Sequence, residues 1–176
     1  MWAALIMMNV IETPRLALRQ LTVEDDAFIY ELVNDPAWLR FIGDRGVRTV
    51  ADARAYILKG PVASYAQHGF GLWLTLRKAG GVPIGMCGLI KRETMEDVDV
   101  GFAILPEFRE QGYAFESASA SLNYGRDVLK LKRIVAVCSP DNAGSIRVLE
   151  KLGLRYEKMI RMTPDAAEIK LFAVNF

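Results

Sequence analysis

Histidine and cysteine are scarce in this chain, which has one His and two Cys among its 176 residues. Because zinc and other transition metals are held by clusters of such side chains, the composition gives no basis for a metal site. Cys87 and Cys138 both lie in apolar, strand-like runs, so we expect buried free thiols rather than a disulfide. Free thiols agree with a reducing, cytoplasmic location.

Long runs of one charge are also missing. The chain carries 22 Lys and Arg against 21 Asp and Glu, which gives a formal net charge of +1. This balance favours neither a nucleic-acid partner nor binding to an anionic membrane surface. The apolar opening MWAALIMM is too short for a membrane span and lacks a basic segment, so we expect residues 1–10 to be an untethered lead-in.

Two common nucleotide-binding signatures are absent as well. The pattern G-x-x-x-x-G-K-[ST] does not occur, and HGFGLW (68–73) lacks the third glycine of a dinucleotide fingerprint and precedes a strand-like run. P-loop and Rossmann-type binding are therefore excluded. What the chain does have is 52% hydrophobic and 10% aromatic residues, which predicts one packed domain over residues 11–176.

Hydrophobic periodicity predicts a succession of strands and helices along the chain. A strand over 11–20 is followed by a helix over 22–34, which Asn34-Asp35-Pro36 would end. After a loop, a second helix covers 49–67. The later elements are expected in this order: strands 69–77 and 83–92, strand 98–105, helix 112–129, strand 133–138, helix 142–152, and strands 154–162 and 168–175.

The stretch PEFREQGYAFES lies where one of these strands gives way to a helix. It contains the pattern R-x-x-G-x-A, formed by Arg109, Gly112 and Ala114. Such a turn directs several free backbone N–H groups at one point, and the positive end of the helix dipole adds to them. Gly112 has no Cβ and so permits a close approach. The pattern predicts a phosphate or pyrophosphate site, although a tight turn before a core helix has the same spacing.

A second strand-turn-helix unit follows, in which RIVAVC (133–138) leads into NAGSIRVLEKLGL (142–154). With GYAFE (112–116) and the opening ETPRLALRQL (12–21), these runs make the chain resemble the GNAT superfamily of acetyl-CoA-dependent N-acetyltransferases. Within that superfamily it is most similar to the RimJ/RimL-like branch. HGFGLW adds to the likeness, which spans nearly the whole chain.

The resemblance implies an α/β (α+β) fold, with a mixed, twisted, mostly antiparallel sheet of about seven strands flanked by about four helices. In that family the strand before the phosphate turn and the strand before the second motif splay apart. The pantetheine arm of acetyl-CoA inserts into this wedge. Here those strands would be 98–105 and 133–138. Phe102, Ala103 and Ile104 would then pair with the pantetheine amides as an added strand does.

The other cofactor-binding candidates implied by the resemblance lie at the start of one of the two motif helices: Arg109, Gln111, Gly112, Tyr113, Ala114, Asn142 and Arg147. The two arginines are candidate phosphate contacts, although isolated arginines are usually surface charges. Gln111 to Ala114 would offer mainly backbone N–H groups. Asn142 would cap its helix and could also reach a cofactor amide.

Acetyl transfer to an amine needs a neutral nucleophile, a polarised thioester carbonyl and a proton for the departing thiolate. Many relatives supply that proton from a Tyr seven residues after the motif Asn, where this chain has Leu149. RimL-like relatives use the Ser three residues after the Asn, so Ser145 is the candidate catalytic acid. A serine in the first turn of a helix also commonly satisfies backbone donors.

No general base stands out. Glu93, Glu96, Asp97 and Asp99 lie near or on a wedge strand, where one of them could draw the proton through water. Taken singly, each is interpreted as a solvated loop charge. A dedicated base is not obligatory, because an α-amine with a reference pKa of about 8 is partly neutral at neutral pH. The single histidine, His68, is expected in a turn.

Trp38 and Phe41 fall between the first two helices, in a region that shapes the acceptor pocket of this superfamily. They are either core anchors or acceptor-binding residues. The implied function is direct transfer from acetyl-CoA to a protein N-terminal amine or a small-molecule amine, in a ternary complex and without a metal. The alternatives are an acyl-CoA-binding module without turnover and a transferase for a longer donor such as succinyl-CoA. Both a monomer and a homodimer fit the sequence.

Overall fold

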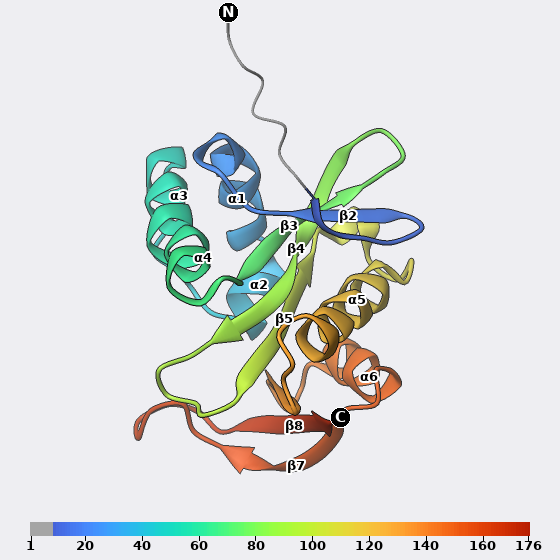
Figure 1. The fold of residues 1–176 in the computed structure, drawn as a ribbon. Helices are drawn as coiled ribbons and strands as arrows, with labels where there is room; N and C mark the ends of the chain where they lie inside the picture. Colours follow the sequence, from blue (N-terminus) through green and yellow to red (C-terminus); the bar gives the residue numbers. More distant parts are fainter. Residues whose placement is uncertain (1–8) are drawn as a thin grey trace, which may run out of the picture.

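The computed structural model describes residues 9–176, which form an eight-stranded sheet with helices on both faces (Figure 1). The strand order is β1-β2-β3-β4-β5-β6-β8-β7, and β5 and β6 form the parallel pair in an otherwise antiparallel sheet. The strands are β1 Asn9–Glu12, β2 Leu16–Arg19, β3 Leu72–Arg77, β4 Val82–Lys91, β5 Val98–Ile104, β6 Arg133–Cys138, β7 Arg155–Ile160 and β8 Ile169–Asn175. The helices are α1 Asp26–Val33, α2 Pro36–Phe41, α3 Val50–Ile57, α4 Ala63–His68, α5 Tyr113–Asp127 and α6 Ala143–Lys151, with 3-10 turns at Val23–Asp25 and Pro106–Phe108.

The expected fold class is confirmed, with eight strands in place of about seven. The extra strand arises because the segment 11–20 is not continuous: β1 and β2 form a hairpin. Between them, the Thr13 N–H donates to the Leu16 carbonyl at 2.9 Å, which closes the turn around Pro14. The prediction of one strand here is wrong because Pro14 has no N–H to contribute to a ladder.

The loop expected to carry Trp38 and Phe41 is instead helix α2. The carboxylate of Asp35 caps it by accepting hydrogen bonds from the N–H groups of Ala37 and Trp38, both at 3.1 Å. Pro36 occupies the first helical turn, where its missing N–H costs nothing. Asn34-Asp35-Pro36 thus ends α1, as predicted, and also begins α2, which was not predicted.

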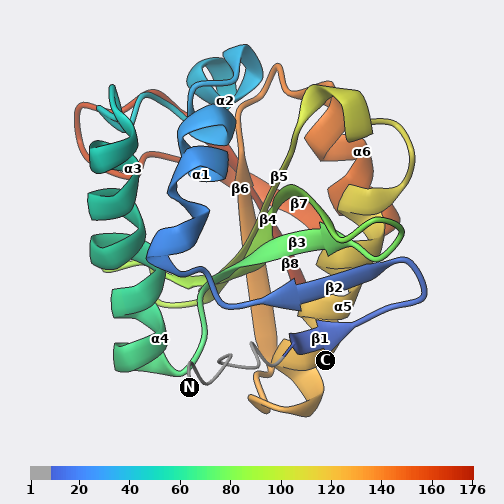
Figure 2. The same ribbon diagram turned by 90° about the horizontal axis from the view of Figure 1, so that it is seen from above.

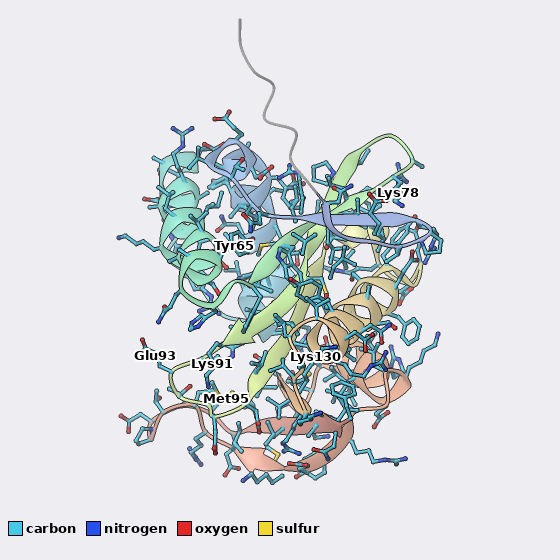
Figure 3. All side chains as sticks on the ribbon, viewed as in Figure 1. Tyr65, Lys78, Lys91, Glu93, Met95 and Lys130 are labelled. Atoms are coloured by element: carbon cyan, nitrogen blue, oxygen red, sulfur yellow. The ribbon has the colours of Figure 1, made fainter. Side chains whose placement is uncertain are left out.

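The predicted second helix is a single helical run with an irregular middle. It consists of α3, a π-helical turn at Leu58–Val62 that contains Pro61, and α4, which ends at Gly69 with a φ of +78°. A wider turn accommodates a proline that cannot join the regular ladder. Tyr65 ties α4 to the sheet, because its hydroxyl accepts from the Leu21 N–H at 3.1 Å and donates to the Leu72 carbonyl (Figure 3).

Hydrophobic side chains cover both faces of the sheet. One cluster, which includes Trp73, Leu122 and Phe172, lies between the sheet and α5 and α6. A second, which includes Ile57 and Leu74, lies under α1 to α3 on the opposite face (Figure 1). The central strands therefore have nearly continuous apolar sequences, as strands buried on both faces do.

Cys87 and Cys138 are buried and free, which confirms their prediction as thiols in the core. Within residues 9–176, no helix is long and apolar enough to cross a membrane, and no group of three or more His, Cys, Asp or Glu is placed to hold a metal ion. Residues 1–8 of the expected lead-in lie outside the described residues, whereas Asn9 and Val10 begin β1.

Candidate functional site

The parallel strands β5 and β6 separate along their length. They pair only at Val98 with Ile134 and at Asp99 with Val135. Their outer edges remain fully paired, β5 with β4 and β6 with β8. Toward the end of the sheet from which the chain enters α5 and α6, the two strands diverge (Figure 2). This geometry confirms the splayed-strand wedge that the sequence predicts.

Backbone groups of β5 face into this wedge. The Leu105 N–H donates to the carbonyl of Ile84, on β4, at 2.9 Å, and hydrogen-bonding directions alternate along a strand. Phe102 therefore directs its N–H and C=O groups away from β4, toward β6. The Ile104 N–H points the same way, whereas the Ile104 carbonyl accepts from Arg109 Nε. An extended ligand with amide groups can pair with such an edge as an added strand does.

The turn between β5 and α5 presents free backbone N–H groups in the geometry that the sequence predicts for an anion site. Glu110 and Gly112 adopt left-handed backbone, with φ values of 60° and 81°. No side chain caps α5, and within residues 9–176 the N–H groups of Gln111 to Phe115 have no hydrogen-bond acceptor. Because α5 is 15 residues long, its dipole adds positive potential at this point. The glycine turn thus has the form that the R-x-x-G-x-A pattern predicts.

Arg15 brings a positive side chain to the turn. Its Nε lies 2.6 Å from Oε2 of Glu116, and its Nη1 donates to the Gln111 carbonyl at 3.0 Å. The guanidinium lies over the Tyr113 ring at 4.5 Å, and Nη2 is 3.3 Å from the position a Cβ on Gly112 would take. Arg15 was not among the predicted site residues, although it lies in the ETPRLALRQL run that carries the family resemblance.

The two arginines expected at the phosphates differ in their surroundings. Arg109 donates through Nε to the Ile104 carbonyl at 2.9 Å and through Nη2 to Asp35 at 2.6 Å. Arg147 is exposed on α6 and has no ion pair among the residues that the structure describes. The Arg109 side chain is therefore engaged within the protein, whereas that of Arg147 extends into solvent.

Asn142 and Ser145 lie at the start of α6, where one caps the helix and the other carries a free hydroxyl. The Asn142 side chain accepts from the Ser145 N–H at 3.1 Å and so caps the helix. The Ser145 hydroxyl, half-buried, has no hydrogen-bond partner in the described part of the chain. The capping role therefore belongs to Asn142, and Ser145 keeps a free hydroxyl. Leu149 is buried in the core and provides no hydroxyl at the position of the usual tyrosine.

Three of the four candidate carboxylates belong to the loop between β4 and β5. Glu93 and Glu96 are exposed, and Glu93 extends from the outside of the loop (Figure 3). Lys91 fixes the loop from within by donating to the carbonyls of Met95 and Glu96, both at 2.6 Å. Asp97 pairs with Arg133 at 2.9 Å. The interpretation as loop charges fits these residues.

Asp99 does not fit that interpretation, which is wrong for this residue. It lies on β5, is the last residue there that pairs with β6, and has a side chain only 1% exposed. Burial raises the pKa of Asp99 to about 6, against the opposing effects of the Arg92 guanidinium and the Val137 N–H. The Arg92 Nε lies 2.6 Å from its carboxylate. Asp99 therefore marks the narrow end of the wedge with a buried ion pair.

Trp38 and Phe41 occupy different environments on α2. Trp38 is 4% exposed and belongs to the core cluster under α1 to α3, which favours its role as a core anchor. Its Nε1 is buried without a hydrogen-bond partner among residues 9–176. Phe41 is half-buried at the end of the helix, with the Arg40 guanidinium 4.8 Å from its ring centre. His68 ends α4, next to the turn at Gly69.

Known proteins share both the sequence and this geometry. Residues 15–155 match the model of the acetyltransferase (GNAT) domain. YnaD of Bacillus subtilis, an uncharacterized N-acetyltransferase, is 32% identical over 147 residues, which cover 84% of this chain and 83% of that protein. The crystal structure of a GNAT-family acetyltransferase from Bacillus anthracis superposes with a TM-score of 0.78 at 26% identity and covers 94% of this chain and 97% of its own.

The fold also matches RimL, a ribosomal L7/L12 α-N-protein acetyltransferase solved in complex with coenzyme A. That structure has a TM-score of 0.81 at 18% identity and covers 96% of this chain and 98% of its own. At this identity the likeness shows a shared fold. The family match, in contrast, includes both the glycine turn before α5 and the second motif. The chain therefore belongs to the GNAT acetyltransferase family.

Proposed function

We propose that this protein transfers an acetyl group from acetyl-CoA to a primary amine, directly and within a ternary complex. The observation that carries the proposal is the uncapped start of α5 beside the unpaired edge of β5. Acetyl-CoA has two matching parts, a pyrophosphate and an extended arm with two amides. The backbone N–H groups of Gln111 to Ala114 suit the first part, and Phe102 and Ile104 suit the second.

The proposed reaction uses a backbone N–H of β5 and the hydroxyl of Ser145. The amine nitrogen attacks the thioester carbonyl, and a free N–H on β5 stabilises the negative charge that develops on its oxygen. When the C–S bond breaks, the Ser145 hydroxyl gives a proton to the departing thiolate and takes up the proton that the attacking nitrogen loses as it becomes an amide. The free hydroxyl of Ser145 and the cap supplied by Asn142 support this role.

The attacking amine needs no strong base. An α-amine with a pKa of about 8 is about one-tenth neutral at pH 7, which supplies a usable nucleophile. Asp99 is buried against Arg92, and Glu93 and Glu96 are exposed on a loop. We therefore infer that the amine loses its proton to water.

The acceptor is a protein N-terminus or a small-molecule amine, and Phe41 on α2 is the proposed contact, while Trp38 anchors the helix in the core. The RimL neighbour, whose name describes an α-N-protein acetyltransferase, supports the first class. Arg147, exposed on α6, remains a proposed phosphate contact. A cytoplasmic location and a monomeric or homodimeric state remain predictions of the sequence.

Calorimetric titration with acetyl-CoA, CoA and succinyl-CoA tests the proposal. We expect micromolar binding of acetyl-CoA, followed by thiol release when N-terminal peptides or polyamines are added. Binding of acetyl-CoA without thiol release from any amine would favour a binding module without turnover. Tighter binding of succinyl-CoA would favour the longer donor, and no binding of any of the three would refute the proposal.

A further inference from the structure

An ion pair connects helix α2 to each of the two turns that flank the wedge. At its start, Asp35 Oδ2 lies 2.6 Å from Nη2 of Arg109, in the turn after β5. Near its end, Arg40 Nη2 lies 3.0 Å from Oδ2 of Asp141, in the turn after β6. The short helix therefore bridges the end of the sheet at which β5 and β6 separate (Figure 2).

The two ion pairs differ in how strongly they hold the helix. In the first pair Arg109 is 38% exposed but the Asp35 carboxylate is only 5% exposed, whereas Arg40 and Asp141 are 65% and 60% exposed. Ion pairs between two exposed side chains contribute little, because water and salt screen them. Removing Arg109 is more costly, since it leaves the buried Asp35 charge without its cationic partner. The pair between Arg109 and Asp35 is therefore the one that can transmit a displacement.

One oxygen atom joins the turn to the helix. Asp35 Oδ2 accepts from Arg109 and also from the N–H groups of Ala37 and Trp38, both at 3.1 Å. Arg109 in turn donates to the Ile104 carbonyl, on the last residue of β5, at 2.9 Å. A movement of the turn thus reaches the backbone of α2 through a single carboxylate.

We propose that Arg109 and Asp35 are positioning residues that couple the acyl-CoA turn to α2, so that ligand binding at the turn stabilises the helix that carries Trp38 and Phe41. This inference rests on the proposed function. It also assigns the Arg109 guanidinium to Asp35 instead of to a phosphate. Coupling between two sites is reciprocal. Bound acetyl-CoA raises the affinity of α2 for the acceptor, and a bound acceptor therefore raises the affinity for acetyl-CoA by the same factor.

Affinity measurements on three variants separate this role from a direct phosphate contact. Arg109→Gln and Asp35→Asn should each weaken acetyl-CoA binding about tenfold, and the double variant should be no weaker than either alone. Asparagine at position 35 keeps an oxygen that can cap α2. If Arg109 contacted a phosphate directly, Asp35→Asn would free the Arg109 guanidinium for that contact. The affinity for acetyl-CoA would then be unchanged or higher. That result would overturn the proposal.

The exposed pair supplies matched controls. Arg40→Gln and Asp141→Asn make the same chemical changes on the same helix and on the second turn. We expect each to change the acetyl-CoA dissociation constant less than about twofold. Losses as large as those of Arg109→Gln and Asp35→Asn would overturn the assignment to Arg109 and Asp35.

Hydrogen exchange of the α2 amides provides a second readout that needs neither activity nor an acceptor. Saturating acetyl-CoA should slow exchange in the peptide over Pro36–Phe41 by at least about fivefold, and Arg109→Gln should abolish this effect at saturation. Binding of acetyl-CoA without a change in this peptide would overturn the coupling alone. Absence of acetyl-CoA binding by the unmodified protein would overturn the proposed function and the coupling together.

Discussion

Gly112 begins α5 with a φ of +81°, a conformation that favours glycine. Among residues 9–176, the one atom within 4 Å of the position of a Cβ is Arg15 Nη2, at 3.3 Å. A side chain there would therefore lie against the Arg15 guanidinium, at the turn itself. Gly112→Glu should weaken acetyl-CoA binding at least about a hundredfold in calorimetry, because it adds bulk and negative charge at the anion site.

A second left-handed glycine provides the control for backbone strain. Gly153 follows α6, has a φ of +88° and has no neighbouring atom within 4 Å of the position that a Cβ would take. Gly153→Glu introduces the same residue with similar strain, away from the phosphate turn. It should lower the melting temperature as Gly112→Glu does and bind acetyl-CoA normally. Equal losses of affinity in both variants would remove the phosphate assignment.

The role proposed for Ser145 affects turnover more than binding. Its hydroxyl is free in the described part of the chain, while Asn142 caps α6. Ser145→Ala should reduce kcat about a hundredfold, as expected for loss of a general acid, and change the acetyl-CoA dissociation constant less than about twofold. Ser119→Ala, a half-buried serine on α5, is the control. Full activity of Ser145→Ala would leave Ser145 with a structural role only.

The buried carboxylate of Asp99 should make stability depend on pH. Burial raises its pKa from 3.8 to about 6, so the folded protein holds a proton between these values that the unfolded chain releases. The free energy of unfolding should therefore fall as the pH rises from about 4 to 6, by up to about 3 kcal/mol. Asp99→Asn removes this contribution.

Urea unfolding from pH 4 to pH 7 measures the effect of Asp99 directly. The difference in free energy of unfolding between the two proteins should move in favour of Asp99→Asn as the pH rises, because only the unmodified protein carries the buried charge. Groups that titrate alike in both proteins contribute equally to the two free energies of unfolding, so their contributions cancel in the difference. A difference that is constant across this range would show that Asp99 keeps its ordinary pKa in the folded protein.

The individual site residues were predictable to the extent that their roles are local. Gly112 and Ser145 lie in short motifs whose geometry follows from a few neighbouring residues. The partner of Arg109 lies 74 residues away, at Asp35, and only the tertiary structure brings the two together. The burial of Asp99 was not predicted, because an acidic side chain is normally exposed and no local sequence signal indicates that this one is buried.

Helix α5 is fastened to the N-terminal hairpin through Glu116 in its first turn. The carboxylate accepts from the Thr13 hydroxyl at 2.6 Å, from the Arg15 N–H at 3.0 Å and from Arg15 Nε at 2.6 Å. Burial acts to raise the pKa of Glu116, but these hydrogen bonds and the Arg15 charge outweigh it and leave the pKa lowered. The clamp therefore stabilises the fold above the ordinary pKa of a glutamate and weakens in acid.

Glu116→Gln tests this clamp. The substitution should lower the free energy of unfolding by about 1–3 kcal/mol at pH 7, because the amide cannot accept all three hydrogen bonds with full charge. The loss should shrink as the pH falls below about 4. Glu107→Gln, an exposed residue of the neighbouring turn, should have almost no effect in the same chemical denaturation measurement. Equal effects of the two changes would argue against the clamp.

The elements near the two motifs were predicted more closely than those of the N-terminal third. The strand predicted over 133–138 coincides with β6, and the helix predicted over 142–152 contains α6. Both have clear apolar periodicity between unambiguous turns. In contrast, Asn34-Asp35-Pro36 carries two signals at once, one that ends a helix and one that begins the next.

The sheet consists of two parts, β1 to β5 and β6 to β8, whose strands meet in two residue pairs between β5 and β6. A ligand in the wedge would contact both parts in the folded protein only, so its binding free energy adds to stability. At a hundredfold excess over the dissociation constant, acetyl-CoA should contribute about 2.7 kcal/mol.

For a chain of 176 residues, this contribution corresponds to a rise in melting temperature of about 5–10 °C. Scanning calorimetry of the unmodified protein and of Gly112→Glu at the same acetyl-CoA concentration tests it. The rise should be absent in the variant, because the phosphate turn supplies the affinity. A similar rise in both proteins would mean that acetyl-CoA binds elsewhere, and the wedge would then lose its assignment as the donor site.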